Sequence, residues 1–358
     1  MKVIVFQRVI LPYRVPFFNE LAKRVDLTVA YYMHDKTGEE CSFEKIKIPY
    51  RKIGPIHFQK GVRRLAKRFD VVVVGTDLHA LGYIALPFFP HNNKLLSWSI
   101  GFRASHSHPY LVDRKHNILD WITSIVLSKC DANIFYMSQA KLFWQNTNLK
   151  QEKFFVAINT VDVANVVSDN ENKKNIIFVG SLYKGKGIDS LFKAVSDATK
   201  KLKKEFHLDI VGDGPCRNEL EQLCDQLGLH DMVTFHGAVF DSRKLADIYS
   251  SAICCVSPKQ AGLSVCTSMG NGVPFITRHD SITGGEIYNI SNGVNGVLYH
   301  SDAELTDVIL DVVDNPSKYI EMGEKAKEYY DNNATIHHMA NGFMNAIEYA
   351  VGDVGMQS

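Results

Sequence analysis

Short apolar runs alternate with segments of helical periodicity along most of this 358-residue chain. Residues 3–6 and 71–75 are apolar runs of strand length, and residues 15–24 repeat apolar positions at helical spacing. This alternation predicts parallel strands joined by helical crossovers.

A polar stretch at residues 159–174 interrupts the alternation, which restarts at 176–180 and continues to a mainly helical end. The pattern predicts an α/β fold of two doubly wound, Rossmann-like domains facing across a cleft. We place the domains at 1–158 and 175–335, the linker at 159–174, and a C-terminal helix at 336–358 that crosses back to the first domain. Ligands of open parallel sheets bind beyond the carboxyl ends of the strands, so two such domains suit an enzyme with two substrates.

Composition narrows the class of protein. Hydrophobic residues make up 46% of the chain, charged residues 22%, and the net charge is +1. This balance disfavours binding to nucleic acid over the surface. The seven cysteines are odd in number and form no CxxC pair, so we expect reduced residues in a cytoplasmic protein. The apolar N-terminal run is too short for a signal peptide or a membrane span.

One turn in the second half has the residues of a phosphate site. An apolar run ends at Gly180 and Ser181, and the following loop carries Lys184, Lys186 and Gly187 before a helical segment. Free N–H groups at a helix N-terminus favour a phosphate, and a lysine strengthens that preference. A plain turn with solvated lysines is the alternative.

Two further turns repeat the theme. Gly212 and Gly214 follow the next strand, and Pro215 suits a first helical position. Arg217 replaces the third glycine of a dinucleotide fingerprint, which disfavours a dehydrogenase. A structural turn remains the alternative here too.

The third turn carries Gly262, and Ser264 is a good N-cap type for the helix that Gly272 would close. Three such helix ends can hold a diphosphate without a metal, and the chain has no Asp-x-Asp pair for magnesium.

These motifs, in this order, resemble the donor domain of glycosyltransferase family 4 over about residues 150–300. The resemblance also rests on His236-Gly237, on Gly284-Gly285-Glu286 and on residues 292–296, and more loosely on 11–18 and 98–103. It implies the GT-B fold, a nucleotide-sugar donor and retention of anomeric configuration.

The resemblance also implies the site. Lys186 should contact the donor diphosphate, Glu286 offers a carboxylate, and Arg14 lies at the start of the first crossover helix. The residues expected to bind the donor are Gly180, Ser181, Gly212, Gly214, His236, Gly237, Val239, Gly262, Leu263, Ser264 and Thr267. Arg103 and His106 are the candidates on the acceptor side. We expect no metal and no cofactor besides the nucleotide-diphosphate sugar.

Three positions depart from the family pattern. Ser181 stands where an arginine is usual, and Lys259 and Thr267 stand where the family has two glutamates. This pattern resembles a subgroup tied to cell-surface polysaccharide synthesis.

We therefore expect a metal-independent, retaining glycosyltransferase of O-antigen, lipopolysaccharide or capsule synthesis. Its acceptor would be lipid-linked or an oligosaccharide. A basic amphipathic helix expected at residues 59–69 would bind the inner face of the cell membrane, with a solvated charged face as the alternative. A sugar-nucleotide epimerase and a non-catalytic glycosyltransferase-like subunit are the competing functions.

Overall fold

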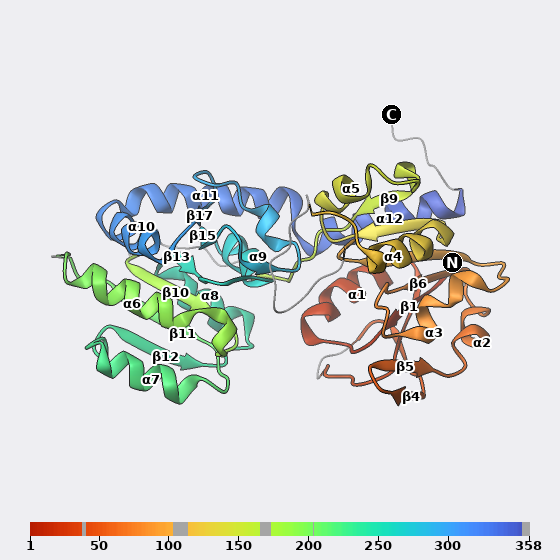
Figure 1. The fold of residues 1–358 in the computed structure, drawn as a ribbon, viewed down its shortest axis with the longest axis horizontal. Helices are drawn as coiled ribbons and strands as arrows, with labels where there is room; N and C mark the ends of the chain where they lie inside the picture. The colour runs from red at the N-terminus through yellow and green to blue at the C-terminus, as the bar shows by residue number, and fades with distance from the viewer. Residues whose placement is uncertain (38–40, 103–113, 165–172, 203, 353–358) are drawn as a thin grey trace. The chain divides into compact units, whose positions relative to one another are not determined.

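The computed structural model describes residues 1–37, 41–102, 114–164, 173–202 and 204–352, which form two compact units (Figure 1). The first unit comprises the described residues up to Asp162 together with those from Thr335 onward, and the second comprises those of Val163–Ala334. Within the described ranges the chain passes between the units at two places, once inside the polar stretch 159–174 and once just before the last helix. Arg103 and His106 lie outside the described residues.

The first unit is built on a seven-stranded sheet in which every neighbouring pair is parallel. The strand order is β3-β2-β1-β6-β7-β8-β9, so the order reverses direction between β1 and β6. The strands are β1 Lys2–Gln7, β2 Asp26–Tyr31, β3 Glu44–Lys47, β6 Val71–Val74, β7 Lys94–Ser99, β8 Ala132–Phe135 and β9 Phe154–Val156.

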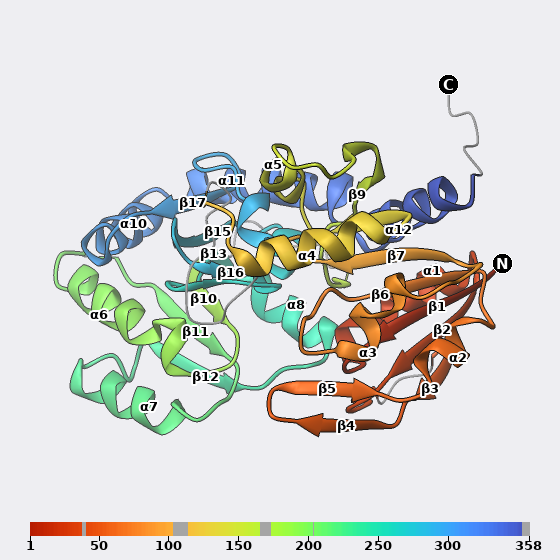
Figure 2. The ribbon, with the colours of Figure 1, turned by 45° about the vertical axis from the view of Figure 1, so that its right-hand side comes forward.

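Helices and one hairpin complete this unit. The antiparallel hairpin of β4 and β5 stands outside the main sheet (Figure 2). The elements are η1 Pro12–Arg14, α1 Val15–Ala22, β4 Tyr50–Ile53, β5 Ile56–Gln59, α2 Val62–Ala66, α3 Leu81–Ile84, η2 Leu86–Phe88, α4 Ile118–Lys129, α5 Gln139–Trp144, η3 Gln151–Lys153 and α12 Ile336–Val351.

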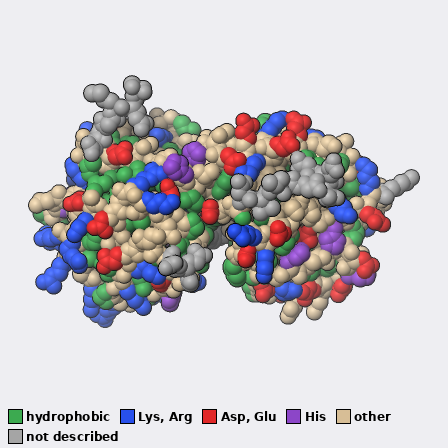
Figure 3. Space-filling view, turned by 180° about the vertical axis from the view of Figure 1, so that it is seen from behind, with side chains coloured by type: hydrophobic (Ala, Val, Ile, Leu, Met, Phe, Trp, Pro, Cys, Tyr) green, Lys and Arg blue, Asp and Glu red, His purple; other side chains and the backbone are tan. Residues whose placement is uncertain are grey.

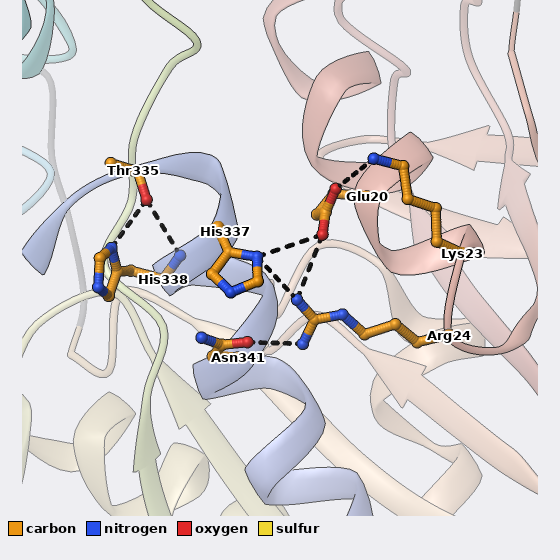
Figure 4. A network of polar contacts seen from close by, with 7 residues as sticks. All are labelled: Glu20, Lys23, Arg24, Thr335, His337, His338 and Asn341. Carbon is orange, nitrogen blue, oxygen red and sulfur yellow. Dashed lines mark hydrogen bonds and ion pairs between the residues drawn. The ribbon is translucent and has the colours of Figure 1, made fainter. Parts of the chain in front are cut away.

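The last helix, α12, belongs to the core of the first unit. Met339, Phe343 and Ile347 recur at helical spacing on one face, and all three are buried against side chains of α1 and the sheet. Polar contacts tie its first turns to the segment just after α1 (Figure 4): Arg24 donates to Asn341 at 2.6 Å and contacts His337 Nδ1 at 3.1 Å. The helix is thereby held by both an apolar stripe and a polar rim.

The second unit has a six-stranded parallel sheet in the order β12-β11-β10-β13-β15-β17, which reverses direction between β10 and β13. Its strands are β10 Asn175–Val179, β11 His207–Val211, β12 Val233–Gly237, β13 Ala252–Val256, β15 Phe275–Arg278 and β17 Gly296–Tyr299, with the small parallel pair β14 Gln260–Ala261 and β16 Ile282–Thr283. Its helices are η5 Lys184–Lys186, α6 Ile188–Thr199, α7 Arg217–Gln226, α8 Ser242–Ser250, α9 Ser264–Gly270, η6 Glu286–Asn289, α10 Asp302–Asp314 and α11 Pro316–Asn333.

The predicted doubly wound α/β class is confirmed in both units, but three local predictions are wrong. The basic helix expected at 59–69 is only α2, because Gln59 pairs with Tyr50 in the hairpin. Helix α7 begins at Arg217, so Pro215 precedes it. Helix α9 is capped at Leu263 without a side-chain hydrogen bond, and Ser264 is its first residue.

The surface is mixed in charge. On the face in Figure 3, basic and acidic side chains are interspersed, and the net charge of the chain is +1. Within the described ranges, no helix combines the length and apolar character needed to cross a bilayer.

Candidate functional site

The three turns singled out in the sequence are neighbours on one edge of the second sheet. They follow β10, β11 and β13, which lie side by side in the order β11-β10-β13. The reversal of strand order between β10 and β13 is the place where open parallel sheets bind ligands. The turn of Lys186 and the turn of Gly262 flank this point.

Two glycines allow the first two turns to touch. A Cβ on Gly212 would lie 1.9 Å from the carbonyl oxygen of Gly180, and one on Gly214 would lie 2.4 Å from that of Leu182. The turns are also hydrogen-bonded, since the Leu182 N–H donates to the Asp213 carbonyl at 3.0 Å. Close backbone packing accounts for both glycines, so a role in lining the donor pocket stays a prediction for them.

Lys186 is buried and its charge lacks a direct partner. Its side chain is 9% exposed, whereas Lys184 in the same turn is exposed. Burial lowers the pKa of Lys186 to about 8, against the opposing effects of Cys255 and Glu286. The ammonium lies 5.8 Å from the centre of the Tyr183 ring and makes no hydrogen bond or ion pair within the described chain. Lys186 is therefore not the solvated lysine of a plain turn.

Glu286 is a carboxylate whose charge raises the pKa of Lys186. It is 4% exposed at the start of η6, and its Oε2 accepts a hydrogen bond of 2.9 Å from the Gly284 N–H. Thr283 Oγ1 donates to the same oxygen at 3.4 Å. These contacts fix the carboxylate in the unit that carries Lys186, while its catalytic role stays a prediction.

The turn after β13 packs on the turn after β10. The Lys259 N–H donates to the Lys186 carbonyl at 3.2 Å, and the Tyr183 hydroxyl donates to Gln260 Oε1. Beyond them, Gly262 has open space where a Cβ would lie. The Thr267 hydroxyl donates back to the Leu263 carbonyl at 3.1 Å, a bond within α9.

Three residues expected to bind the donor, His236, Gly237 and Val239, lie at or just after the end of β12, the edge strand next to β11. His236 Nε2 lies 2.7 Å from Oδ1 of the buried Asp209, and the Gly237 carbonyl accepts from the Gly212 N–H at 2.8 Å. Val239 is half-buried and Ser181 is exposed on the same unit. His236 is thus tied to the sheet by a hydrogen bond to Asp209.

Arg14 belongs to the first unit and is 6% exposed. Its guanidinium lies 4.9 Å from the ring centre of Trp98, 5.1 Å from that of Tyr13 and 5.2 Å from that of Tyr136. It also donates to the Tyr136 hydroxyl at 3.0 Å. Aromatic rings thus surround this buried cation, and its catalytic role stays a prediction.

Sequence reasoning missed a polar cluster at the reversal point of the first sheet, between β1 and β6. His57 is buried, and one ring nitrogen lies 3.1 Å from the Tyr32 hydroxyl. Burial, followed by the charge of Arg8, lowers the pKa of His57. Nearby, His79 Nδ1 lies 2.8 Å from Asp77 Oδ1, and the His79 carbonyl accepts from the His57 N–H at 2.7 Å. The cluster depends on hairpin β4–β5, which the sequence pattern did not predict.

Metal-ligand chemistry is sparse in the parts of the chain that the structure describes. No three His, Cys, Asp or Glu side chains there are grouped to hold an ion. Five of the seven cysteines are buried.

Residues 163–329 match the family model described as glycosyl transferases group 1. An uncharacterized glycosyltransferase of Haemophilus influenzae is 26% identical over 297 residues, which cover 78% of each chain. The lipopolysaccharide core biosynthesis glycosyltransferase LpsD of Rhizobium meliloti is 42% identical over 62 residues, or 17% of each chain.

Among solved structures, HepE of Anabaena in complex with UDP is similar in fold. The two are 14% identical, with a TM-score of 0.73 over 97% of this chain and 100% of that one. This likeness confirms the predicted GT-B class of fold.

Proposed function

We propose that the chain transfers a sugar from a nucleotide-diphosphate sugar to an acceptor hydroxyl, because residues 163–329 match the family model of the group 1 glycosyltransferases. The donor would bind at the reversal point of the second sheet. The observation that carries the proposal is Lys186, a nearly buried ammonium at that point with no direct anionic partner in the described chain.

The chemistry requires charge to be stabilised as the sugar–phosphate bond breaks. Negative charge builds on the leaving diphosphate while the sugar becomes oxocarbenium-like. Lys186 and the N–H groups at the start of α6 supply fixed positive charge for the leaving group, without a metal ion. Because Glu286 raises the pKa of Lys186, it helps to keep the ammonium protonated at neutral pH.

We further propose retention of anomeric configuration, as the family resemblance implies. In that course the acceptor attacks the face that the diphosphate leaves. The departing phosphate oxygen is then in place to take the proton of the acceptor hydroxyl.

The acceptor is proposed to bind to the first unit, at the reversal point of its sheet. Arg8, His57 and His79 supply hydrogen-bond donors there, and the neighbouring Asp77 supplies an acceptor. A sugar with several hydroxyls suits such a mixed set. The similarity to LpsD supports a role in cell-surface polysaccharide synthesis, with a lipid-linked or oligosaccharide acceptor at the cytoplasmic face of the membrane.

A panel of UDP-, GDP-, dTDP- and ADP-sugars should be screened by thermal shift, because a ligand that binds the native state raises its melting temperature. The stabilising donor is then incubated with oligosaccharide and lipid-linked acceptors, with and without EDTA, and the anomeric configuration of the product is read by NMR. We expect a product of the donor's own configuration in both conditions. Failure of every nucleotide to bind would refute the proposal.

The same experiment separates the competing functions. A donor that isomerises without an acceptor indicates an epimerase. A donor that binds but is never transferred indicates a non-catalytic subunit.

A further inference from the structure

Lys259 lies against the turn that carries Lys186. A Cβ built on Gly187 would be 2.8 Å from Lys259 Cγ, 2.9 Å from its Cδ and 3.2 Å from its Cε. The long side chain of Lys259 therefore covers Gly187, which has a φ of +72° and is the N-cap of α6. The main chains are joined as well, since the Lys259 N–H donates to the Lys186 carbonyl.

This places two lysines from different turns at one helix N-terminus. Lys186 comes from the turn after β10 and Lys259 from the turn after β13, so they flank the reversal point of the sheet. Helix α6 has 12 residues, and no side chain caps its first N–H groups. Because that end carries a partial positive charge, lysines are unfavourable neighbours for it.

The described residues provide little to offset this charge. Neither lysine forms an ion pair or donates a side-chain hydrogen bond to another described residue, although exposed lysines elsewhere in the unit pair readily, as Lys200 does with Asp197 at 2.8 Å. Lys186 is more than nine-tenths buried, and Glu286 is the carboxylate that acts on it. Two cations lie at this helix start, opposed by the buried Glu286 and by Asp189 in the first turn of α6. Because neither lysine pairs directly with a carboxylate of the described chain, the two together form a site for an added anion.

We propose that Lys259 is a second cation of the donor site and binds an anionic group of the nucleotide sugar beside Lys186. The inference rests on the proposed function. The group is an oxyanion, and the donor offers it in two places: the diphosphate of any nucleotide sugar, or a carboxylate on an acidic sugar such as a uronate.

The test is Lys259→Met, which keeps the unbranched stem over Gly187 and removes the charge. Lys184→Met is the matched control, because it removes an exposed lysine from the neighbouring turn. Calorimetry measures the dissociation constants of UDP, GDP, UDP-glucose and UDP-glucuronate for each form. Losing a charge-assisted hydrogen bond should weaken binding about 10- to 100-fold, and Lys259→Arg should restore much of it.

The pattern of loss identifies the anion. Equal weakening for UDP, UDP-glucose and UDP-glucuronate shows that Lys259 holds the diphosphate. Weakening for UDP-glucuronate alone shows that it holds the sugar carboxylate.

Two outcomes go against the inference and differ in meaning. If the unaltered protein binds these ligands and Lys259→Met binds all of them equally well, Lys259 is not part of the site, and the proposed function stands. If the unaltered protein binds no nucleotide diphosphate, the proposed function fails first.

Discussion

Replacing Lys186 by methionine should make the protein more stable and abolish its binding of nucleotide diphosphates. Methionine matches the unbranched lysine stem and is suited to a buried site. The buried ammonium lowers the stability of the folded protein, because its charge is removed from water. Its charge becomes favourable only when an anion is bound. The two effects of the substitution therefore have opposite signs.

The size of the gain follows from the pKa. Burial lowers the pKa of Lys186 from its ordinary 10.5 to about 8, which corresponds to about 3 kcal/mol at 1.36 kcal/mol per pH unit. That figure already includes the attraction of Glu286, and it is an upper bound. We expect a gain of about 1–3 kcal/mol at pH 7, or roughly 2–10 °C in the melting temperature of the second unit.

The pH dependence provides an internal check. Below pH 8 the lysine is protonated in both the folded and the unfolded chain, so the full destabilisation is present. Between about pH 8 and 10.5 the folded chain loses the proton first, and the stability of the unaltered protein should rise relative to Lys186→Met. The stability difference between the two forms should vanish above that range.

Scanning calorimetry across this pH range, with and without UDP, measures both effects, and Lys184→Met is the control. UDP should raise the melting temperature of the unaltered protein and of the control, but not of Lys186→Met. If Lys186→Met is less stable than the unaltered protein at pH 7, or if UDP still stabilises it, the assignment of Lys186 as an unpaired cation awaiting the diphosphate is refuted.

Three further predictions concern the same features. Affinity for UDP should fall as pH rises above about 8, because the Lys186 ammonium loses its proton. Calorimetric titration near pH 8 in buffers of different ionisation enthalpy should show that the protein takes up protons when UDP binds. Binding without proton uptake would contradict this prediction. Gly212→Ala places a Cβ 1.9 Å from a carbonyl oxygen and should cost more than about 2 kcal/mol by urea unfolding, against about 1 kcal/mol for Gly228→Ala, which has a φ of +69° but open space. Gly342→Ala should destabilise the first unit by about 1–3 kcal/mol, because the new Cβ would lie 2.1 Å from the Val156 carbonyl oxygen. This cost outweighs the gain of about 1 kcal/mol in helix propensity. A stabilised variant would show that α12 is not packed this closely.

Much of the architecture could be predicted because fully buried parallel strands are continuous apolar runs. Strands such as β6 and β13 are buried at every residue, and the alternation with helices gave the doubly wound class. The sequence pattern did not predict the hairpin β4–β5, because all four residues of β4 are exposed and form no apolar run. Strand β3 was not predicted for a related reason, since its sequence Glu44-Lys45-Ile46-Lys47 is typical of a polar loop.

The candidate site was only partly within reach of sequence reasoning. The turns of Gly180, Gly212 and Gly262 were found because each follows a strand, and strand order then made them neighbours. The contact of Lys259 with Gly187 was not predictable, since it depends on the turns after β10 and β13 packing against each other. The chain also gives no local sign that Gly212 serves a backbone contact, because a strand-end glycine looks the same in either role.

The chain returns to the first unit after Ala334, and this limits when that unit can fold during synthesis. Met339, Phe343 and Ile347 are part of the same core as strands β1 and β2, although more than three hundred residues separate them along the chain. A ribosome therefore releases the strands of this unit long before it releases the helix that covers them. The half of the protein that is made first can finish folding only after the other half has been synthesised.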